Sequence, residues 1–170
     1  MTEQIPEKSR KGLYGISDHF FEFWFRFVFR NRGLLEEGKL AETMKTIKIG
    51  IGELLARNYE EISVEWARRN FPEQYRYVGR WWDANAEIDV VGVHPETKEI
   101  LFGECKWSSK PVGANVFDDL KKKARAVEWN RDDRREAFIL FSKSGFTEGM
   151  IRVAQEEGVI LVQGDQKIEG

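Results

Sequence analysis

The stretch AEIDVVGVHPETKEILFGECKW, residues 86–107, decides the fold of this chain. Two largely apolar segments, 86–94 and 99–107, flank the turn sequence PETK, and the first of them is rich in β-branched residues. So short a connection between two such segments is typical of an antiparallel β-hairpin. The second segment also carries an acid and a base two positions apart, Glu104 and Lys106, inside an otherwise apolar strand.

The alternation of side chains along a strand groups these charges. Glu104 and Lys106 share one face of the strand, and Cys105 points to the other. Asp89 lies in the preceding strand, and neighbouring strands run about 4.8 Å apart, so Asp89 and Glu104 approach each other if the register permits. Two adjacent carboxylates repel unless a cation lies between them, and hard ions such as Mg²⁺ or Mn²⁺ take oxygen sites of this kind.

These residue types predict a hydrolytic metal site. Asp89 and Glu104 are the expected ligands, and the main-chain carbonyl of Cys105 is a further one. Lys106 would face the substrate and stabilise an anionic transition state. A bound metal ion lowers the pKa of water and offsets phosphate charge, as phosphodiester hydrolysis requires. The alternative is an ordinary Glu–Lys pair on a solvated sheet face.

The flanking sequence predicts helices packed on a mixed sheet. Strands that alternate with helices along the chain favour an α/β domain. The expected elements are a strand over 75–83 before the hairpin, and after it a helix over 115–130, a strand over 136–142, a helix over 147–158 and a last strand over 159–164.

An aromatic helix is predicted near the N-terminus. Asp18 stands where an N-cap belongs, and the following residues, 19–30, are aromatic nearly all round. Two interpretations remain open for this helix. It is either a core helix buried on several sides or a docking surface for another chain or domain.

Residues 31–39 are expected to form a loop. The loop contains a near-match to a phosphate-binding motif, but Leu40 follows it where a magnesium-binding Ser or Thr is needed, so nucleotide binding is not expected. A helical pattern then runs from Leu40 to about residue 70, and Gly50 and Gly52 are expected to interrupt it.

The composition bounds the class of protein. With 170 residues, 41% of them hydrophobic, the chain is long enough for one domain with a real core. Its net charge of -2 gives no overall basic field, so any contact with nucleic acid needs a local patch. The candidates for phosphate contacts are Lys110, Lys121, Lys122 and Arg125. The alternative is that Lys121, Lys122 and Arg125 only form the solvated face of a helix.

The cellular setting is suggested by cysteine usage and by the hydrophobic pattern. A single cysteine excludes an internal disulfide, and a reducing, cytoplasmic setting is expected. The most apolar segment, residues 19–29, is too short and too charged for a membrane span, so no membrane role is expected.

The motifs EIDVVGV and ILFGECKW resemble the PD-(D/E)XK nuclease superfamily, which has the restriction-endonuclease-like fold. Asp89 matches its metal-binding acid, with Ile88 in place of the proline, and Glu104, Cys105 and Lys106 match its (D/E)-x-K element. Further motifs, LYGISDHFFEFWFRFVFRNRG, NYEEI, GRWWD and ILFSKSGF, are similar to the C-terminal region of archaeal-type AAA ATPases. This narrower resemblance covers about residues 13–146.

The resemblance implies a restriction-endonuclease-like mixed sheet flanked by helices. Residues 1–39 would be an N-terminal aromatic helical extension, with a winged-helix remnant at 11–17, and residues 40–170 a nuclease-like domain. It also implies Glu60 of NYEEI as a further catalytic acid, Mg²⁺ or Mn²⁺ as cofactor and DNA as substrate. Implied partners are an ATPase domain, another chain, or a second copy bound through the aromatic helix. The alternative function is a non-catalytic accessory domain that binds nucleic acid or a partner.

Overall fold

The computed structural model describes residues 18–168. They form two compact units, which divide between Asn58 and Tyr59 inside the long helix α3 (Leu40–Asn70). We call residues 18–58 the helical unit and residues 59–168 the sheet unit. The expected domain boundary after residue 39 stays a prediction, and the expected winged-helix remnant lies outside the described residues.

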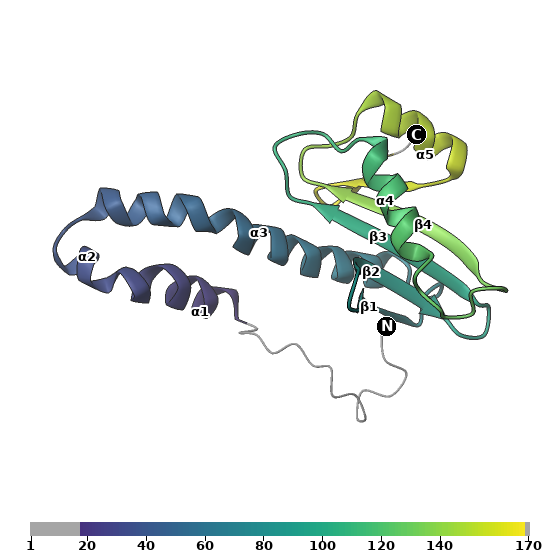
Figure 1. Ribbon diagram of the computed structural model, residues 1–170, viewed down its shortest axis with the longest axis horizontal. Helices are drawn as coiled ribbons and strands as arrows, with labels where there is room; N and C mark the ends of the chain where they lie inside the picture. The colour runs from purple at the N-terminus through teal and green to yellow at the C-terminus, as the bar shows by residue number, and fades with distance from the viewer. Residues whose placement is uncertain (1–17, 169–170) are drawn as a thin grey trace. The chain divides into compact units, whose positions relative to one another are not determined.

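The sheet unit confirms the predicted α/β class with a mixed sheet flanked by helices (Figure 1). Its strands lie side by side in sequence order: β1 to β3 form an antiparallel meander, β3, β4 and β5 are parallel, and β6 is antiparallel to β5. Parallel neighbours need crossover connections, which α4 and α5 supply. After α3 the elements are β1 (Tyr77–Trp82), β2 (Glu87–His94), β3 (Glu99–Lys106), α4 (Ala114–Ala124), β4 (Arg135–Ser142), α5 (Glu148–Glu157), β5 (Ile160–Gln163) and β6 (Gln166–Lys167).

Both faces of the sheet are covered. α4 and α5 lie on one face (Figure 1), where Phe117 and Met150 share an apolar core with Phe102 of β3. The last turns of α3 cover the other face, where Tyr59 shares a second core with Leu101. Because β2 and β3 are buried on both sides, they are apolar along most of their length, and a charged residue within them needs a partner.

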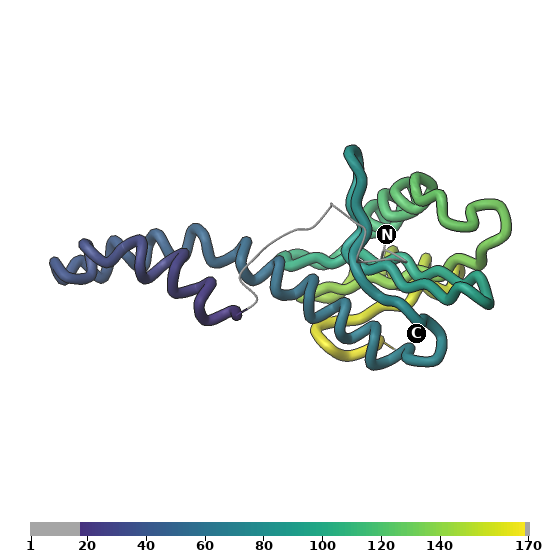
Figure 2. Tube along the Cα trace, turned by 90° about the horizontal axis from the view of Figure 1, so that it is seen from below, coloured from purple at the N-terminus to yellow at the C-terminus, as the bar shows by residue number. Residues whose placement is uncertain are grey.

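The helical unit is a hairpin of irregular helix against the first part of α3, and its two arms run side by side in Figures 1 and 2. Asp18 caps its start as predicted, accepting hydrogen bonds of 2.9 and 3.0 Å from two amides of the first turn. Glu22 and Arg57 form an ion pair between the arms. Arg26 and Glu53 form a second one. The first arm consists of α1 (His19–Phe23), a π-helical turn (Trp24–Val28), a 3-10 turn (Phe29–Asn31) and α2 (Arg32–Glu36).

Two local predictions for the helical unit are wrong. The loop expected over 31–39 is mostly helical, because α2 occupies it, and the chain turns only near Gly38, whose φ is 72°. The expected interruption of α3 does not occur, and the helix runs unbroken over 31 residues. Gly50 instead makes room for Phe27, since a Cβ at Gly50 would lie 2.8 Å from its ring. A glycine costs a helix about 1 kcal/mol, which such packing offsets.

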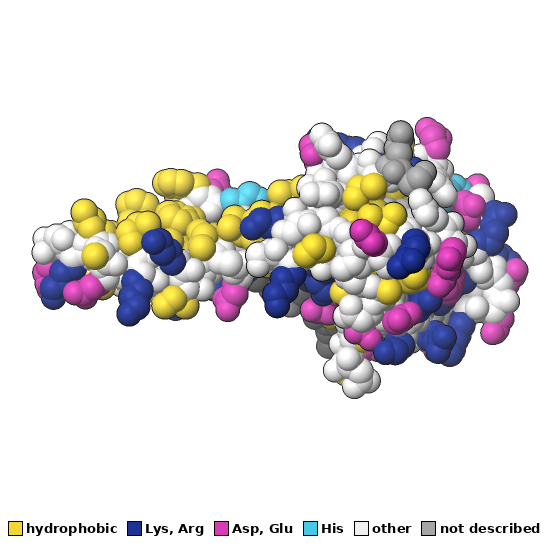
Figure 3. Space-filling model, turned by 90° about the horizontal axis from the view of Figure 1, so that it is seen from above, with side chains coloured by type: hydrophobic (Ala, Val, Ile, Leu, Met, Phe, Trp, Pro, Cys, Tyr) yellow, Lys and Arg dark blue, Asp and Glu magenta, His cyan; other side chains and the backbone are white. Residues whose placement is uncertain are grey.

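The aromatic side chains of the helical unit are mostly exposed. Phe27 is buried, whereas Phe20 is 64% and Phe29 is 55% exposed. The core-helix interpretation is therefore wrong for most of these residues, and the exposure favours a docking surface. Figure 3 shows hydrophobic side chains gathered along this unit. We call Phe20, Phe21, Trp24, Phe25 and Phe29 the aromatic surface. No helix within the described range is long and apolar enough to cross a membrane.

Candidate active site at the divergence of β2 and β3

A bulge in β2 positions the predicted metal-binding acid. The register between β1 and β2 slips by one residue, so that Asp89 and Val90 together oppose Arg80 of β1. An extra residue in one strand bends it and redirects its side chains, and bulges are common beside active sites. On its other side β2 pairs with β3 as far as Val90 and Gly103. Asp89 lies just beyond that last pair, where the two strands diverge.

The Asp89 carboxylate reaches toward the main chain of β3. Its Oδ2 accepts a hydrogen bond of 2.8 Å from the main-chain N–H of Cys105, in the place a backbone carbonyl would take in a continuous ladder. The residue is only 5% exposed. Burial, and then the charge of Glu104, raise the pKa of Asp89 to about 7 against the opposing effect of the Cys105 N–H. The raised pKa means that this carboxylate holds its proton to a higher pH than an exposed aspartate, unless a cation neutralises it.

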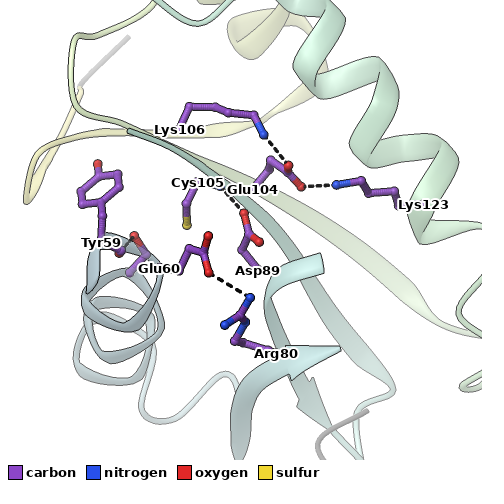
Figure 4. A network of polar contacts seen from close by, with 9 residues as sticks. Tyr59, Glu60, Arg80, Asp89, Glu104, Cys105, Lys106 and Lys123 are labelled. Carbon is purple, nitrogen blue, oxygen red and sulfur yellow. Dashed lines mark hydrogen bonds and ion pairs between the residues drawn. The ribbon is translucent and has the colours of Figure 1, made fainter. Parts of the chain in front are cut away.

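Glu104 is a buried carboxylate held by two lysines. Lys106 Nζ donates to its Oε1 at 2.7 Å, and Lys123 Nζ from α4 donates to its Oε2 at 2.8 Å (Figure 4). The Glu104 side chain is 7% exposed. A buried charge is stable only when it is paired and hydrogen-bonded, and here each oxygen has its own ammonium partner. Although burial alone would lower the pKa of Lys106, the hydrogen bond and charge of Glu104 raise it.

Glu60 joins the cluster from α3. Arg80 forms an ion pair with it at 2.9 Å, and both side chains are partly buried (Figure 4). Burial raises the pKa of Glu60, Arg80 opposes that rise, and the negative charge of Glu104 adds to it. Glu60 also contributes to the raised pKa of Asp89. The three carboxylates therefore lie within electrostatic range of one another.

The alternation of side chains along β3 places Glu104 and Cys105 on opposite faces of the sheet, as expected. Glu104 lies on the face covered by α4, as its contact with Lys123 requires. Cys105 points to the opposite core, beneath α3, where burial raises the pKa of its thiol. The thiol is thus a packed core group rather than a nucleophile. Tyr59, on the same side, donates a hydrogen bond of 3.3 Å to the Gly164 carbonyl.

The site offers a hard divalent cation two carboxylates and a main-chain carbonyl rather than a full set of side-chain ligands. Within residues 18–168, no three His, Cys, Asp or Glu side chains are grouped closely enough to hold a metal ion. The oxygen donors on offer are the carboxylates of Asp89 and Glu104 and the main-chain carbonyl of Cys105, and Mg²⁺ commonly combines one or two carboxylates with several waters. The two ammonium groups on Glu104 carry the same total charge as one divalent ion.

The four residues predicted to contact nucleic acid lie on α4, at its C-terminal end and in the loop that follows β3. Lys121 pairs with Asp118 and Glu157, and Lys122 pairs with Asp119 on the helix surface. Arg125 is exposed at the C-terminal end of α4, and Lys110 is exposed in the loop that follows β3.

The sequence analysis did not assign Arg80 or Lys123 to this cluster. Arg80 alternates with apolar and aromatic neighbours in β1, and a charge inside an aromatic strand was the available signal. Lys123 belongs to a run of three lysines and stands beside Ala124 of the apolar helix stripe. That position, at the border of the buried face, distinguishes it from Lys122, but only the packing of α4 on the sheet reveals its partner.

Residues 24–126 match the DUF234 family, described as archaea bacterial proteins of unknown function, and the match covers more than half of the chain. The chain belongs to this family. The DUF234 match includes every residue of the cluster, from Glu60 to Lys123. The family resemblance and the carboxylate–lysine cluster therefore fall on the same part of the chain.

A curated relative is similar to most of this chain, but this chain matches only part of that relative. The uncharacterized protein MJECL04 of Methanocaldococcus jannaschii is 30% identical over 151 residues, which are 84% of this chain and 33% of that protein. The chain thus spans about a third of the length of the curated relative it matches.

Two solved structures cover little more than half of the chain. A repair endonuclease from Pyrococcus abyssi has a TM-score of 0.42 at 16% identity, over 61% of this chain and 45% of that one. EndoMS in complex with double-stranded DNA has a TM-score of 0.37 at 20% identity, over 58% of this chain and 41% of that one. At TM-scores below 0.5 the folds coincide only partly, and nothing about this chain follows from them.

Proposed function

We propose that this chain is a nuclease-like domain that hydrolyses phosphodiester bonds of DNA with the help of Mg²⁺ or Mn²⁺. The observation that carries the proposal is the buried cluster in which Asp89, Glu104 and Lys106 meet where β2 and β3 diverge. Three coupled carboxylates beside a lysine have a structural cost that an ordinary surface pair would not have. A functional role explains why such a cluster is kept inside an apolar sheet.

Each residue has a task in this proposal. Asp89 and Glu104 hold the cation, with the Cys105 carbonyl as a further donor. The cation would activate water and offset phosphate charge. Lys106 places its ammonium at the mouth of the cluster, where it stabilises the negative charge that grows on the phosphate during attack. Glu60, fixed by Arg80, orients the water from the α3 side.

Basic residues around the site supply the contacts that position DNA. Lys110, Lys121, Lys122 and Arg125 lie on the loop after β3 and on α4, beside the helix position of Lys123. Contacts of this kind are sequence-independent, and each lost phosphate contact lowers the slope of log K against log salt by about 0.9. Replacing Lys122 with Gln and Arg125 with Gln together is expected to lower this slope by about 1.8 if both side chains bind phosphate.

The decisive experiment is a plasmid-nicking assay with Mg²⁺, Mn²⁺ or EDTA. We expect the wild type to nick only with a divalent ion, and Glu104→Gln and Lys106→Met to lower the rate about 100-fold or more. Glu99→Gln is the matched control, because Glu99 starts the same strand at a site partly open to solvent. Circular dichroism and thermal unfolding verify that each variant is folded.

The assay also separates the alternative function. Nicking that survives in Glu104→Gln and Lys106→Met would come from a contaminant and would contradict the proposal. A wild type that binds DNA but cleaves no single-stranded, duplex or branched substrate with either ion would be a non-catalytic accessory domain.

We also propose that the aromatic surface docks a further domain of the ATPase type that the resemblance implies. Two observations support this choice of partner. Five aromatic side chains about half exposed leave on the order of 500 Å² of ring surface open, in the upper part of the range for the largest patch of a monomer, and such patches are often functional. In the Methanocaldococcus relative, about two thirds of the chain lies outside the matched region, which leaves room for such a domain.

Light scattering tests the docking proposal against self-association. We expect the isolated chain to be a monomer at micromolar concentration, because the proposed partner of its aromatic surface is a different domain and not a second copy of the chain. A stable dimer that the double variant Phe21→Asp, Phe25→Asp dissociates would overturn this proposal in favour of a second copy of the chain.

A further inference from the structure

We infer that Lys123 is a built-in counter-ion of Glu104, which competes with a divalent cation for this carboxylate. Lys123 acts on the site through Glu104 and is therefore a positioning residue. The inference deepens the proposed function and rests on its cation site, but it does not depend on DNA cleavage.

The contact of Lys123 differs from those of its neighbours on α4. Its ammonium donates at 2.8 Å to a carboxylate that is 7% exposed, whereas Lys122 pairs with the exposed carboxylate of Asp119. The Lys123 side chain is itself 28% exposed. One lysine of the run thus turns inward to the cluster, and the next one remains at the surface.

The two ammonium groups of Lys106 and Lys123 cannot both stay at Glu104 when a cation binds there. Lys106 and Lys123 already place two positive charges on Glu104. A divalent ion at Glu104 would meet both ammonium groups at short range, and like charges this close repel strongly in a partly buried site. One of the two ammonium groups therefore has to move away when the cation binds.

Lys123 is the group that is free to move. Lys106 lies two positions from Glu104 on the same strand and face, so the strand geometry keeps it near. Lys123 instead reaches the carboxylate from a separate helix through a long, flexible side chain. Asp119 lies one helical turn before it, at the spacing of side-chain neighbours. The pKa of Asp119 is lowered by its hydrogen bond to Lys122 and also by the charge of Lys123, so a second partner is within range.

The inference predicts that neutral residues at position 123 tighten cation binding. In Lys123→Met the competing charge is gone, and Oε2 of Glu104 is left open for the ion. We expect the dissociation constant for Mn²⁺ to fall about tenfold or more, given the strength of charge interactions in partly buried sites. Lys123→Gln should act in the same direction, and because its amide still donates a hydrogen bond it serves if Lys123→Met fails to fold.

The experiment is a Mn²⁺ titration of the metal-stripped full chain, in which the electron paramagnetic resonance signal of free Mn²⁺ is measured. Lys98→Met is the matched control, because Lys98 lies in the β2–β3 turn, at the other end of the hairpin from Glu104, and pairs with the exposed Asp133. Lys123→Arg keeps the charge. Both should bind Mn²⁺ like the wild type. Glu104→Gln should bind weakly whatever stands at position 123.

The outcomes separate this inference from the proposed function. Tighter binding in Lys123→Met and Lys123→Gln alone supports the inference, even if no variant cleaves DNA. Equal binding in wild type and Lys123→Met, or an equal gain in Lys98→Met, overturns it and leaves the cation site standing. If neither the wild type nor any variant binds Mn²⁺, the cation site and the inference both fail.

Discussion

Replacing Asp89 with asparagine is expected to stabilise the metal-free protein while it destroys the proposed cation site. The pKa of Asp89 rises from its ordinary 3.8 to about 7 in the folded protein, mainly through burial. Each tenfold change in proton affinity corresponds to 1.36 kcal/mol, so the ionised carboxylate costs the fold about 4 kcal/mol at most. Asparagine has no charge to bury, and its side-chain oxygen can still accept the Cys105 N–H.

The sign of the pH dependence follows from the raised pKa. The folded state holds the proton of Asp89 more tightly than the unfolded state does, so this residue lowers stability as the pH rises from about 4 to about 7. Below that range both states are protonated, and above it both are ionised. Between pH 5 and pH 8 the wild type should lose about 2 to 3 kcal/mol relative to Asp89→Asn.

Urea unfolding in EDTA at pH 5 and pH 8 measures both effects. Asp89→Asn should be more stable than the wild type by about 2 to 4 kcal/mol at pH 8, and the gain should shrink at pH 5. Glu96→Gln is the control, because Glu96 is a highly exposed acid in the turn after β2 and its replacement is expected to leave the pH dependence unchanged. A gain for Asp89→Asn that is equal at both pH values, or a loss at pH 8, would refute the assignment of a buried, costly charge to Asp89.

Three further predictions concern the support of the site. The Arg134 side chain is 2% exposed and donates to the carbonyl of Ala124, at the end of α4, and to those of Val127 and Trp129 just after it. Arg134→Met should therefore cost about 3 to 5 kcal/mol in urea unfolding, whereas Glu136→Gln at its exposed partner should cost about 1 kcal/mol or less. In Gly103→Ala the new Cβ would lie 2.8 Å from side chains of both neighbouring strands, and the unfolding free energy should fall by about 1 to 3 kcal/mol. Arg80→Met removes the partner of a half-buried acid, so its loss of stability should be larger at pH 8 than at pH 5, and an equal loss at both would contradict the ion pair with Glu60.

Much of the sheet could be predicted because its signals are local. The β2–β3 hairpin follows from two largely apolar segments and a short turn, and α5 follows from its Thr147 cap and from Gly158, whose φ is 70°. The loop predicted over 31–39 was wrong because α2 occupies most of it, and of its two glycines only Gly38 adopts a positive φ. Glycine inside a helix costs little enough for tertiary contacts to overrule it.

The candidate site was predictable in its acids and in Lys106, but not in its electrostatics. The β2 bulge that aims Asp89 at the main chain of β3 depends on the register with β1, which no local pattern specifies. The second lysine of Glu104 comes from a residue 19 positions away. Such partners depend on how a helix settles on a sheet, and the sequence period says only which helix face is apolar.

By itself, the sequence determined which strands carry the charges and which charges share a face, because the two-residue period of a strand fixes both. Only the tertiary structure decided that β3 and β4 are parallel, that Arg80 holds Glu60, and that Lys123 reaches Glu104 from α4. The physical reason is that side-chain direction is a local property of the backbone, whereas the burial and neutralisation of a charge depend on groups that packing brings together from distant parts of the chain.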